Sequence, residues 1–351
     1  MRSIRKISWV LILGLVVALV VAGCGGKGQA PQETSKGQQE AQQKEQQAEK
    51  KADDFPTKPI QILCASKAGS PVDVMARTLA KHAEKYLGQP ITVVQKTGGS
   101  TANQQAAMLA APADGYTLGT VTPSAIGAWN TNLKGQFSMD QYDFIVRVQA
   151  DPYVVVVNAN SPFKTLKDMV EWAKQNPGKL KAGGFGSTGS GHNVAFNLLA
   201  KAANMPFTWM PFDGGSEAVA AVLGGHIDVC NTNPGNVLQH VQAGKLRVLG
   251  VMYDERLDAL PDVPTYKEAG YDVDTSWIQW RGIFAKKGIP KERIDKLADA
   301  FLKAIKEPEF QKYLKDTNQL DGSMGPEEFT AAAKKTDKIL KEILAELEMK
   351  K

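Results

Sequence analysis

Cysteine and histidine are scarce in this sequence, which has three Cys and four His among its 351 residues. They form no CxxC pair and no closely spaced Cys/His group, so the spacing typical of metal ligands is missing. We therefore predict no metal and no cofactor. Cys64 and Cys230 lie in apolar, strand-like runs, where a free cysteine behaves as a small buried hydrophobic residue. A disulfide between them remains an alternative, because the sequence does not supply the geometry of the pair.

An excess of one sign of charge is also missing. The chain has 42 Lys and Arg against 37 Asp and Glu, which gives a formal net charge of +5. It has no basic block and no alternation of basic and aromatic residues, so the pattern of a nucleic-acid-binding surface is absent. We predict no nucleic-acid partner.

Long apolar runs are absent apart from one near the N-terminus. Residues 7–21 are almost unbroken apolar sequence, but a run of this length falls short of the roughly 20 residues that cross a bilayer. Arg2, Arg5 and Lys6 precede the run, and small residues close it. Positive charge, a short apolar core and small residues in this order are typical of a signal peptide.

The run ends in Val21-Ala22-Gly23-Cys24, which resembles the bacterial lipobox. The resemblance implies cleavage before Cys24 and a diacylglyceryl group on its sulfur; an ordinary signal peptide and an uncleaved anchor are the alternatives. We expect residues 1–23 to be a lipoprotein signal peptide. Residues 24–54 are rich in Gln, Glu, Lys and Ala and almost lack apolar residues, which predicts a disordered tether behind the lipidated Cys24.

The rest of the chain, about 300 residues, is too large for one ordinary core and suits two lobes. From Lys58 onward, strand patterns alternate with helix patterns, which favours an α/β fold with mostly parallel sheets. Residues 153–157 are a continuous apolar run, as in a strand that is buried on both faces. Residues 73–87 and 194–203 are predicted helices.

Three turns that follow predicted strands are rich in Gly, Ser and Thr. In open parallel sheets, ligands bind at the carboxyl ends of strands, against loops that begin helices. Small residues let backbone N–H groups approach a ligand, a following helix N-terminus favours an anion, and hydroxyls add donors. Such turns can hold a carboxylate without a full positive charge, although Gly and Ser also make simple tight turns. They are residues 67–73, 122–124 and 186–192.

Two patterns at the third turn point to other chemistries. Gly184-Phe185-Gly186-Ser187-Thr188-Gly189 fits the GxGxxG dinucleotide fingerprint, but it lies in mid-chain and the acid that follows is only loosely placed for a ribose. Ser187 or Ser190, with His192 and Asp228, supplies the residue types of a serine hydrolase. No G-x-S-x-G elbow is present, so we prefer neither interpretation.

Short segments from Phe55 to about Ile343 match, in one order, the usage of a known family of receptors. The matching segments include Phe55-Pro56-Thr57-Lys58-Pro59-Ile60, Leu87-Gly88-Gln89-Pro90-Ile91-Thr92-Val93, Ala111-Pro112-Ala113-Asp114-Gly115-Tyr116-Thr117-Leu118, Leu223-Gly224-Gly225-His226-Ile227-Asp228 and Leu260-Pro261-Asp262-Val263-Pro264-Thr265. On these segments the chain resembles the periplasmic solute receptors of tripartite tricarboxylate transporters.

The resemblance implies a non-enzymatic receptor with the two-lobed, type II periplasmic-binding-protein fold, in which two α/β lobes close over a ligand. It implies that the ligand carboxylate is held between the first Gly-rich loop of lobe one and the Gly/Ser loop of lobe two. Neighbouring strand ends and an aromatic residue near the hinge complete the implied site. Carried onto this sequence, the ligand-binding residues are Ala68, Gly69, Ser70, Val72, Asp73, Thr122, Ser124, Ser187, Thr188, Ser190, His192, Thr232, Asn233 and Trp280.

The first loop departs from the family pattern. The family usually has three Gly and then Thr before the Asp, whereas here Gly69-Ser70-Pro71-Val72 precede Asp73. Val72 has no hydroxyl and Pro71 has no N–H donor, so we expect Ser70 and Lys67 to compensate. The ligand therefore cannot be assumed to be citrate. Arg281 is a second departure, which either pairs with a second ligand carboxylate or has a structural role.

We therefore expect a monomeric, lipid-anchored receptor on the outer face of the cell membrane, the periplasmic side in a two-membrane host. It would capture a small carboxylate, such as a di- or tricarboxylate, for integral-membrane transporter subunits. A sensing receptor for a signalling system would use the same lobes and is the alternative. The expected bounds are 55–155 and 279–351 for lobe one and 156–278 for lobe two.

Overall fold

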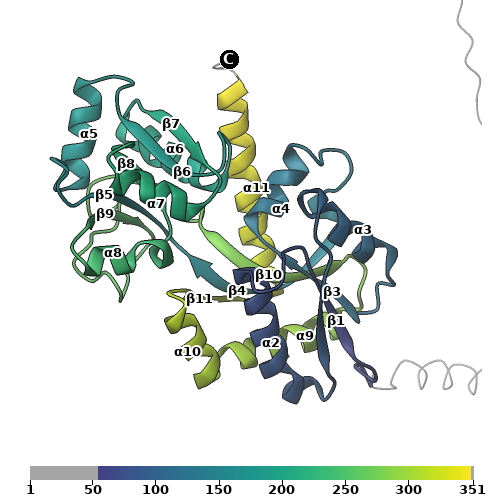
Figure 1. Ribbon diagram of the computed structural model, residues 1–351. Coiled ribbons are helices and arrows are strands. Elements are labelled where there is room, and N and C mark those ends of the chain that lie inside the picture. The colour runs from purple at the N-terminus through teal and green to yellow at the C-terminus, as the bar shows by residue number, and fades with distance from the viewer. Residues whose placement is uncertain (1–53, 349–351) are drawn as a thin grey trace, which may run out of the picture. The chain divides into compact units, whose positions relative to one another are not determined.

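The computed structural model describes residues 54–348 (Figure 1). The predicted signal peptide, Cys24 and all of the tether except residue 54 lie outside these residues. Within the described range, no helix has both the length and the apolar character that a membrane crossing requires.

Two sheets organise the described chain. The first has the strand order β11-β4-β10-β3-β1-β2 and the second β7-β6-β8-β5-β9. The first sheet consists of β1 (Ile60–Cys64), β2 (Ile91–Gln95), β3 (Thr117–Val121), β4 (Tyr142–Asp151), β10 (Gln279–Lys286) and β11 (Leu320–Met324). The second consists of β5 (Tyr153–Asn158), β6 (Lys181–Phe185), β7 (Thr208–Phe212), β8 (Val229–Thr232) and β9 (Leu246–Met252).

The α/β architecture is confirmed, but both sheets are mixed rather than mostly parallel. The strands that lead into the Gly-rich loops are parallel, with β1 between β2 and β3, and β6 between β7 and β8. The strands next to the crossovers, β4, β5 and β10, pair antiparallel with their neighbours. The reason is that β4 and β10 belong to connections between the sheets rather than to β-α-β units. The predicted border at residues 155 and 156 falls inside β5.

Helices cover both faces of each sheet. On the first sheet, α2, α9 and α10 share one buried cluster, and α3, α4 and the first part of α11 share the other. On the second sheet, α5 and α6 cover one face and α7 and α8 the other. The helices are α2 (Pro71–Leu87), α3 (Ala102–Ala110), α4 (Pro123–Asn130), α5 (Leu166–Gln175), α6 (Gly191–Ala203), α7 (Gly215–Leu223), α8 (Leu238–Gln242), α9 (Lys291–Ile305), α10 (Pro308–Asp316) and α11 (Pro326–Glu348), with short 3-10 turns η1 (Gly99–Thr101), η2 (Met139–Gln141) and η3 (Pro234–Asn236).

Strand β5 confirms the interpretation of its apolar run. Alternate side chains point to opposite faces of a sheet. Val155 and Val157 join the cluster under α5 and α6, whereas Val154 and Val156 join the cluster under α7 and α8. All four are fully buried, as expected for β5, an interior strand of the second sheet that lies between β8 and β9.

Helix α11 belongs to both lobes, and Figure 1 shows it running between them. Phe329 and Ala333, in its first half, pack in the first lobe. Ile339 and Ile343, further along, pack in the second. The helix therefore joins the lobes in addition to the two places where the chain crosses between the sheets.

The two described cysteines are free, and each lies in a different sheet. Cys64 ends β1 and Cys230 is on β8, and both are fully buried. The alternative of a disulfide between them is therefore wrong. Burial raises the pKa of the Cys230 thiol to about 12, so this residue is an unreactive part of the core.

Candidate functional site

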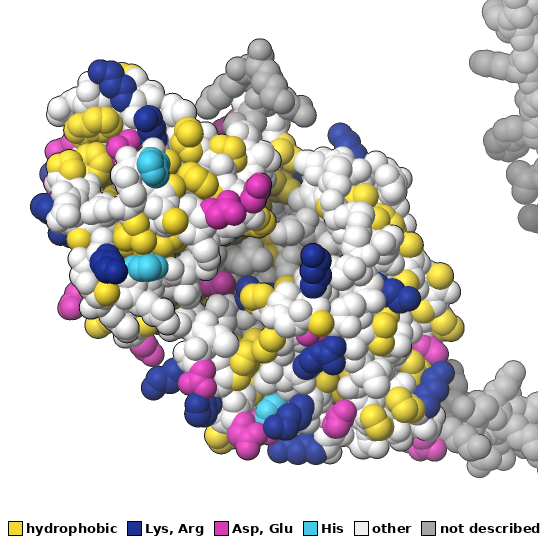
Figure 2. Space-filling view, viewed as in Figure 1, with side chains coloured by type: hydrophobic (Ala, Val, Ile, Leu, Met, Phe, Trp, Pro, Cys, Tyr) yellow, Lys and Arg dark blue, Asp and Glu magenta, His cyan; other side chains and the backbone are white. Residues whose placement is uncertain are grey.

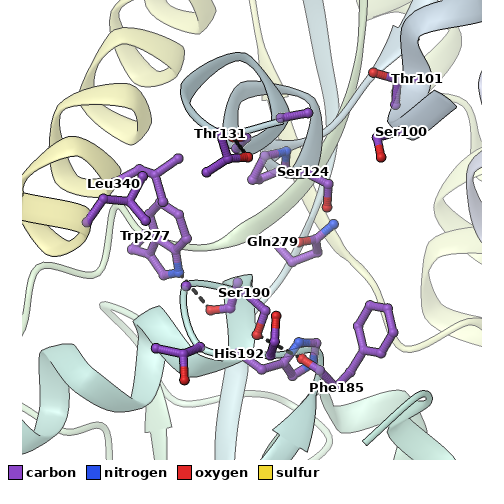
Figure 3. A pocket seen from close by; sticks show the side chains of 18 of the residues that line it. Ser100, Thr101, Ser124, Thr131, Phe185, Ser190, His192, Trp277, Gln279 and Leu340 are labelled. Carbon is purple, nitrogen blue, oxygen red and sulfur yellow. Dashed lines mark hydrogen bonds between the residues drawn. The ribbon is translucent and has the colours of Figure 1, made fainter. Parts of the chain in front are cut away.

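A cleft of about 750 Å³ lies between the two sheets. Figure 2 shows the surface hollowed between the lobes, and Figure 3 shows the side chains that surround the space. Its walls are rich in hydroxyl groups, which the two lobes both contribute. These are Ser100, Thr101, Ser124, Thr131, Ser187, Thr188 and Ser190.

The first lobe supplies the beginnings of two helices. Ser124 lies in the first turn of α4, which has no side-chain cap. Ser100 and Thr101 precede α3 and have φ angles of 53° and 85°. Left-handed backbone is unfavourable for a β-branched residue such as Thr101, and strain of this kind gathers at functional sites. Gln105 stabilises the turn by donating from Nε2 to Thr101 Oγ1 at 2.6 Å.

The second lobe supplies the loop between β6 and α6. Ser190 caps α6, since its Oγ accepts from the Asn193 N–H at 3.3 Å and donates to the Phe185 carbonyl at 3.0 Å. The Gly189 N–H donates to Asn193 Oδ1 at 2.9 Å. Gly186 and Gly189 have φ angles of 87° and 86°, which favour glycine. These contacts hold the loop with the N-terminus of α6 at the cleft.

A cluster of buried polar side chains forms the floor of the cleft, where the chain passes from β4 to β5. Arg281 Nη2 lies 3.8 Å from Asp151 Oδ2, and its Nη1 donates to Gln319 Oε1 at 2.7 Å. Asn233 Nδ2 donates to the carbonyls of Asp151 and Pro152, both at 3.0 Å. Among the described residues, neither Asp151 Oδ1 nor Arg281 Nε has a hydrogen-bond partner. The two lobes therefore meet at an ion pair that is almost completely removed from water.

Burial decides the protonation of two groups in the cleft. It raises the pKa of Asp151 to about 6, although the Arg281 cation and the Gln319 and Asn233 side chains act in the opposite direction. Burial also lowers the pKa of His192 to about 4, with a smaller opposing effect from Asn233. At neutral pH the Asp151 carboxylate is thus mostly ionised and the His192 imidazole is neutral.

The first Gly-rich loop lies beside a second, neighbouring cavity of about 380 Å³. Gly69 and Pro71 line this second cavity, whereas the residues of the β6–α6 loop line the larger cleft. The two cavities share Asp151, Asn233 and Arg281. The two predicted loops therefore lie on either side of the ion pair and do not enclose one common space.

Asp73 and Ser70 have structural roles in this loop. Asp73 is 2% exposed and accepts from the Gly69 N–H at 2.9 Å, from Arg77 Nε at 3.1 Å and from Gln95 Nε2 at 2.5 Å. Burial alone would raise its pKa, but these donors together lower it. Ser70 caps α2 by accepting from the Asp73 N–H. The Asp73 carboxylate is thus already occupied by its own loop and helix.

Several other predicted residues lie outside both cavities. Trp280 is 1% exposed and packs edge-to-face on Phe329 of α11, because alternation along β10 turns it into the core while Gln279 and Arg281 face the cleft. Thr232 is fully buried, and its Oγ1 accepts from Asn236. Neither residue lines either cavity, so their contact with a ligand stays a prediction. Neither cavity is lined by Lys67, Ala68, Val72 or Thr122.

The cleft residues that the sequence did not indicate include Ser100, Thr101, Phe185, Trp277 and Gln279. Ser100 and Thr101 follow Gly98-Gly99 and precede a helix, which is the same signal that identified the other loops. The place of Trp277 depends on tertiary structure, since its Nε1 donates to the Gly191 carbonyl across the chain at 3.0 Å. No local pattern indicates this contact.

The components of a serine hydrolase are not assembled. Asp228 precedes β8 and accepts from the N–H of Lys181, the first residue of β6. It therefore lies at the opposite end of the strands from the β6–α6 loop. The partner of His192 Nε2 is Asn233 Oδ1, at 3.1 Å, rather than a serine or an acid. Ser190 Oγ is engaged as a helix cap. This arrangement fits a binding loop and not a nucleophile with its base.

Two α/β lobes joined at a buried hinge, with a hydroxyl-lined cleft between them, define a two-lobed solute-binding protein. Residues 75–347 match the family model described as tripartite tricarboxylate transporter family receptor. The chain belongs to this family of extracytoplasmic substrate-binding receptors, which are not enzymes.

Individual relatives agree with the family. A Cupriavidus necator protein described as "UPF0065 protein in gbd 5'region" is 33% identical over 301 residues, covering 86% of this chain and 90% of the relative. A crystal structure of a TctC solute binding protein from Polaromonas, without ligand, has a TM-score of 0.76 and 28% identity, and the match covers 83% of this chain and 99% of that one. MatC from Rhodopseudomonas palustris, with bound malate, has a TM-score of 0.63 and 22% identity over 82% of this chain and 99% of MatC.

Proposed function

We propose that this protein captures a small organic acid in the cleft and presents it to the integral-membrane subunits of a transporter. The observation that carries the proposal is the pair of facing walls in which Ser124 lies in the first turn of α4 and Ser190 caps α6. MatC, which has the same fold, is described with malate, a carboxylate. The family's association with tricarboxylate transport supports the same class of ligand.

The chemistry of the walls suits an anion. The first N–H groups of a helix have no partner within the helix and carry part of its positive dipole. A carboxylate that lies between the first turns of α4 and α6 would accept from backbone and hydroxyl donors of both lobes. Because such a ligand gains its full set of donors only when the lobes approach, it would favour the closed form. We therefore assign ligand contacts to Ser124, Ser187, Thr188, Ser190 and His192.

The membrane attachment is part of the same proposal. Cys24 would carry the lipid, residues 24–54 would form the tether, and the receptor would act as a monomer near the outer face of the membrane. Two acyl chains anchor a protein stably where a single chain is marginal. Intact-mass analysis of the membrane fraction should find the lipid on Cys24, and Cys24→Ala should release the protein; an unlipidated mature protein would contradict the anchor.

A charge placed in the cleft tests the binding site. Ser124→Glu puts a carboxylate in the first turn of α4, where it would repel the ligand. We expect calorimetric titration to show carboxylate binding weakened at least about tenfold, since like charges a few ångströms apart cost more than about 1.4 kcal/mol in a partly buried site.

Ser216→Glu is the matched control. Ser216 lies in the first turn of α7 and does not line the cleft, so this variant adds the same charge at an equivalent helical position. Binding should be unchanged. Equal losses in the two variants, or no binding of any mono-, di- or tricarboxylate by the unaltered protein, would contradict the proposed function.

A further inference from the structure

The charges of the cleft cancel within the protein. Asp151 and Arg281 are the charged side chains among the described residues that line it. They face each other at 3.8 Å, and Arg281 also donates to Gln319 at 2.7 Å. The guanidinium is therefore already matched by a carboxylate of the protein. A ligand carboxylate at this point would compete with Asp151 and would meet no uncompensated positive charge.

His192 does not supply the missing cation. Asn233 Nδ2 donates to two backbone carbonyls, so the orientation of its amide is fixed and Oδ1 faces His192 Nε2. An amide oxygen only accepts, and Nε2 must therefore carry the proton of a neutral ring. Burial also lowers the pKa of His192 to about 4, which agrees with this neutral form. The described lining thus offers dipoles and hydroxyls to an anionic group, but no positive charge that the protein itself leaves uncompensated.

Large apolar side chains occupy the sides of the same cleft. In Figure 3, Trp277 and Leu340 lie on one side of Ser124, Ser190 and Gln279, and the ring of Phe185 lies on the other. Phe185 is 48% exposed, which is unusual for a large hydrophobic side chain in the described part of the chain. Its ring approaches His192 edge-on, with centroids 5.8 Å apart. A ligand with an apolar body would cover this ring.

We propose that the cleft selects a monocarboxylate with an aromatic or extended apolar body over di- and tricarboxylates. The inference rests on the proposed function and adds the class of acid. Each further carboxylate must give up its hydration, and without a free cation this loss is not compensated. An apolar body instead gains free energy in proportion to the apolar surface that it covers.

The test is calorimetric titration of the full chain, freed of any retained ligand, with phenylacetate, hexanoate, acetate, malate and citrate. We expect phenylacetate and hexanoate to bind at least about tenfold more tightly than citrate, as the burial of one large apolar group predicts. Acetate, which has the same charge and no apolar body, should bind more weakly than either.

Two variants locate the apolar contact. Phe185→Ala should weaken the binding of phenylacetate by roughly five- to tenfold and should change the affinity for acetate by less than about twofold. Met210→Ala is the matched control, because Met210 is also a large exposed hydrophobic residue of the second lobe, 38% exposed, and does not line the cleft. It should leave both acids unchanged.

The outcomes separate the two proposals. Tighter binding of malate or citrate than of phenylacetate overturns the selectivity proposed here but leaves the carboxylate receptor intact. Equal effects of Phe185→Ala and Met210→Ala also overturn it, since the apolar contact would then lie elsewhere. Failure of all five acids to bind overturns both proposals.

Discussion

Asp151 and Arg281 carry opposite charges into a site that excludes most water, at the point where the chain passes from the first lobe to the second. Burial of charge is costly, and the Asp151 pKa of about 6 reflects that cost even in the presence of Arg281. Removal of one partner leaves the other without compensation, whereas removal of both leaves a neutral site.

A double-mutant cycle tests this dependence. We expect Arg281→Met to lower the free energy of unfolding at pH 8 by about 3–5 kcal/mol, because the buried Asp151 must then either stay ionised without a partner or take up a proton. Asp151→Asn alone should also destabilise the protein, while the double variant should lose much less than the sum of the two single losses. Urea denaturation measures all four proteins. Strictly additive losses would show that the two charges do not interact.

The lowered pKa of His192 makes the stability of the protein depend on pH. Its pKa is lowered to about 4 in the folded protein, so between about pH 6.5 and pH 4 the unfolded chain binds a proton that the folded chain does not. Stability from this group is complete above about pH 6.5 and falls as the pH falls, by up to about 3 kcal/mol. Asp151, whose pKa is raised, acts in the opposite direction in the same window.

His192→Gln isolates this contribution, because Asp151 is present in both proteins. We expect the unaltered protein to lose about 2–3 kcal/mol more than the variant between pH 7.5 and pH 4.5. Denaturant titrations at the two pH values give the difference. Parallel losses would mean that the folded state tolerates a protonated imidazole at this position.

Some residues of the cleft could be predicted from the sequence and others could not. Ser124, Ser190 and His192 could be placed at the cleft because Gly, Ser and Thr gather where strands end and helices begin. Trp280 was predicted at the site, whereas Trp277 lines the cleft, because the side of β10 that faces the cleft depends on its pairing with β4. Arg281 was left open between two roles, and its buried partner Asp151, far away in the sequence, favours the structural one.

Gly184 of strand β6 lies too close to its neighbours for a larger residue to fit. A Cβ on Gly184 would lie 2.7 Å from the Asn231 carbonyl oxygen, 2.8 Å from the Trp209 ring and 3.2 Å from His192 Cβ. The backbone of β8 cannot move away without breaking its pairing with β5 and β6. We therefore expect Gly184→Ala to cost about 1–3 kcal/mol of stability.

Gly214→Ala is the control for this substitution. Gly214 precedes α7 with a φ of −153°, and a Cβ at this position would have no heavy atom beyond its chain neighbours within 4 Å. Its replacement should change the free energy of unfolding by less than about 1 kcal/mol. Thermal and urea denaturation compare the two variants; equal effects would show that β6 and β8 do not need their close approach.

Other elements differ in how well their sequences predict them. The run in β5 and the helical patterns of α2 and α6 were confirmed because local pattern and burial agree. Strand β4 was not predicted. Its buried positions include the polar residues Gln149 and Asp151, which interrupt the apolar pattern of a buried strand. Their partners, Gln319 and Arg281, come from distant segments, so the sequence around β4 does not predict that these polar groups are buried.

Residues 54–348 combine two sheets, two crossovers between them and a helix that packs in both lobes. Ile339 and Ile343 tie α11 to the second lobe, and its Asp337 accepts from Asn130 Nδ2 of α4 in the first. Closure of the cleft must therefore turn the lobes about a region that includes α11 and the Asp151–Arg281 pair.

A crystal structure of the protein with a bound acid, phenylacetate being the first choice, tests this account most directly. The account predicts a carboxylate between the first turns of α4 and α6, within hydrogen-bond distance of donors from both lobes, with the lobes closer together around it. An acid bound away from these turns, or held by one lobe alone, would contradict the account.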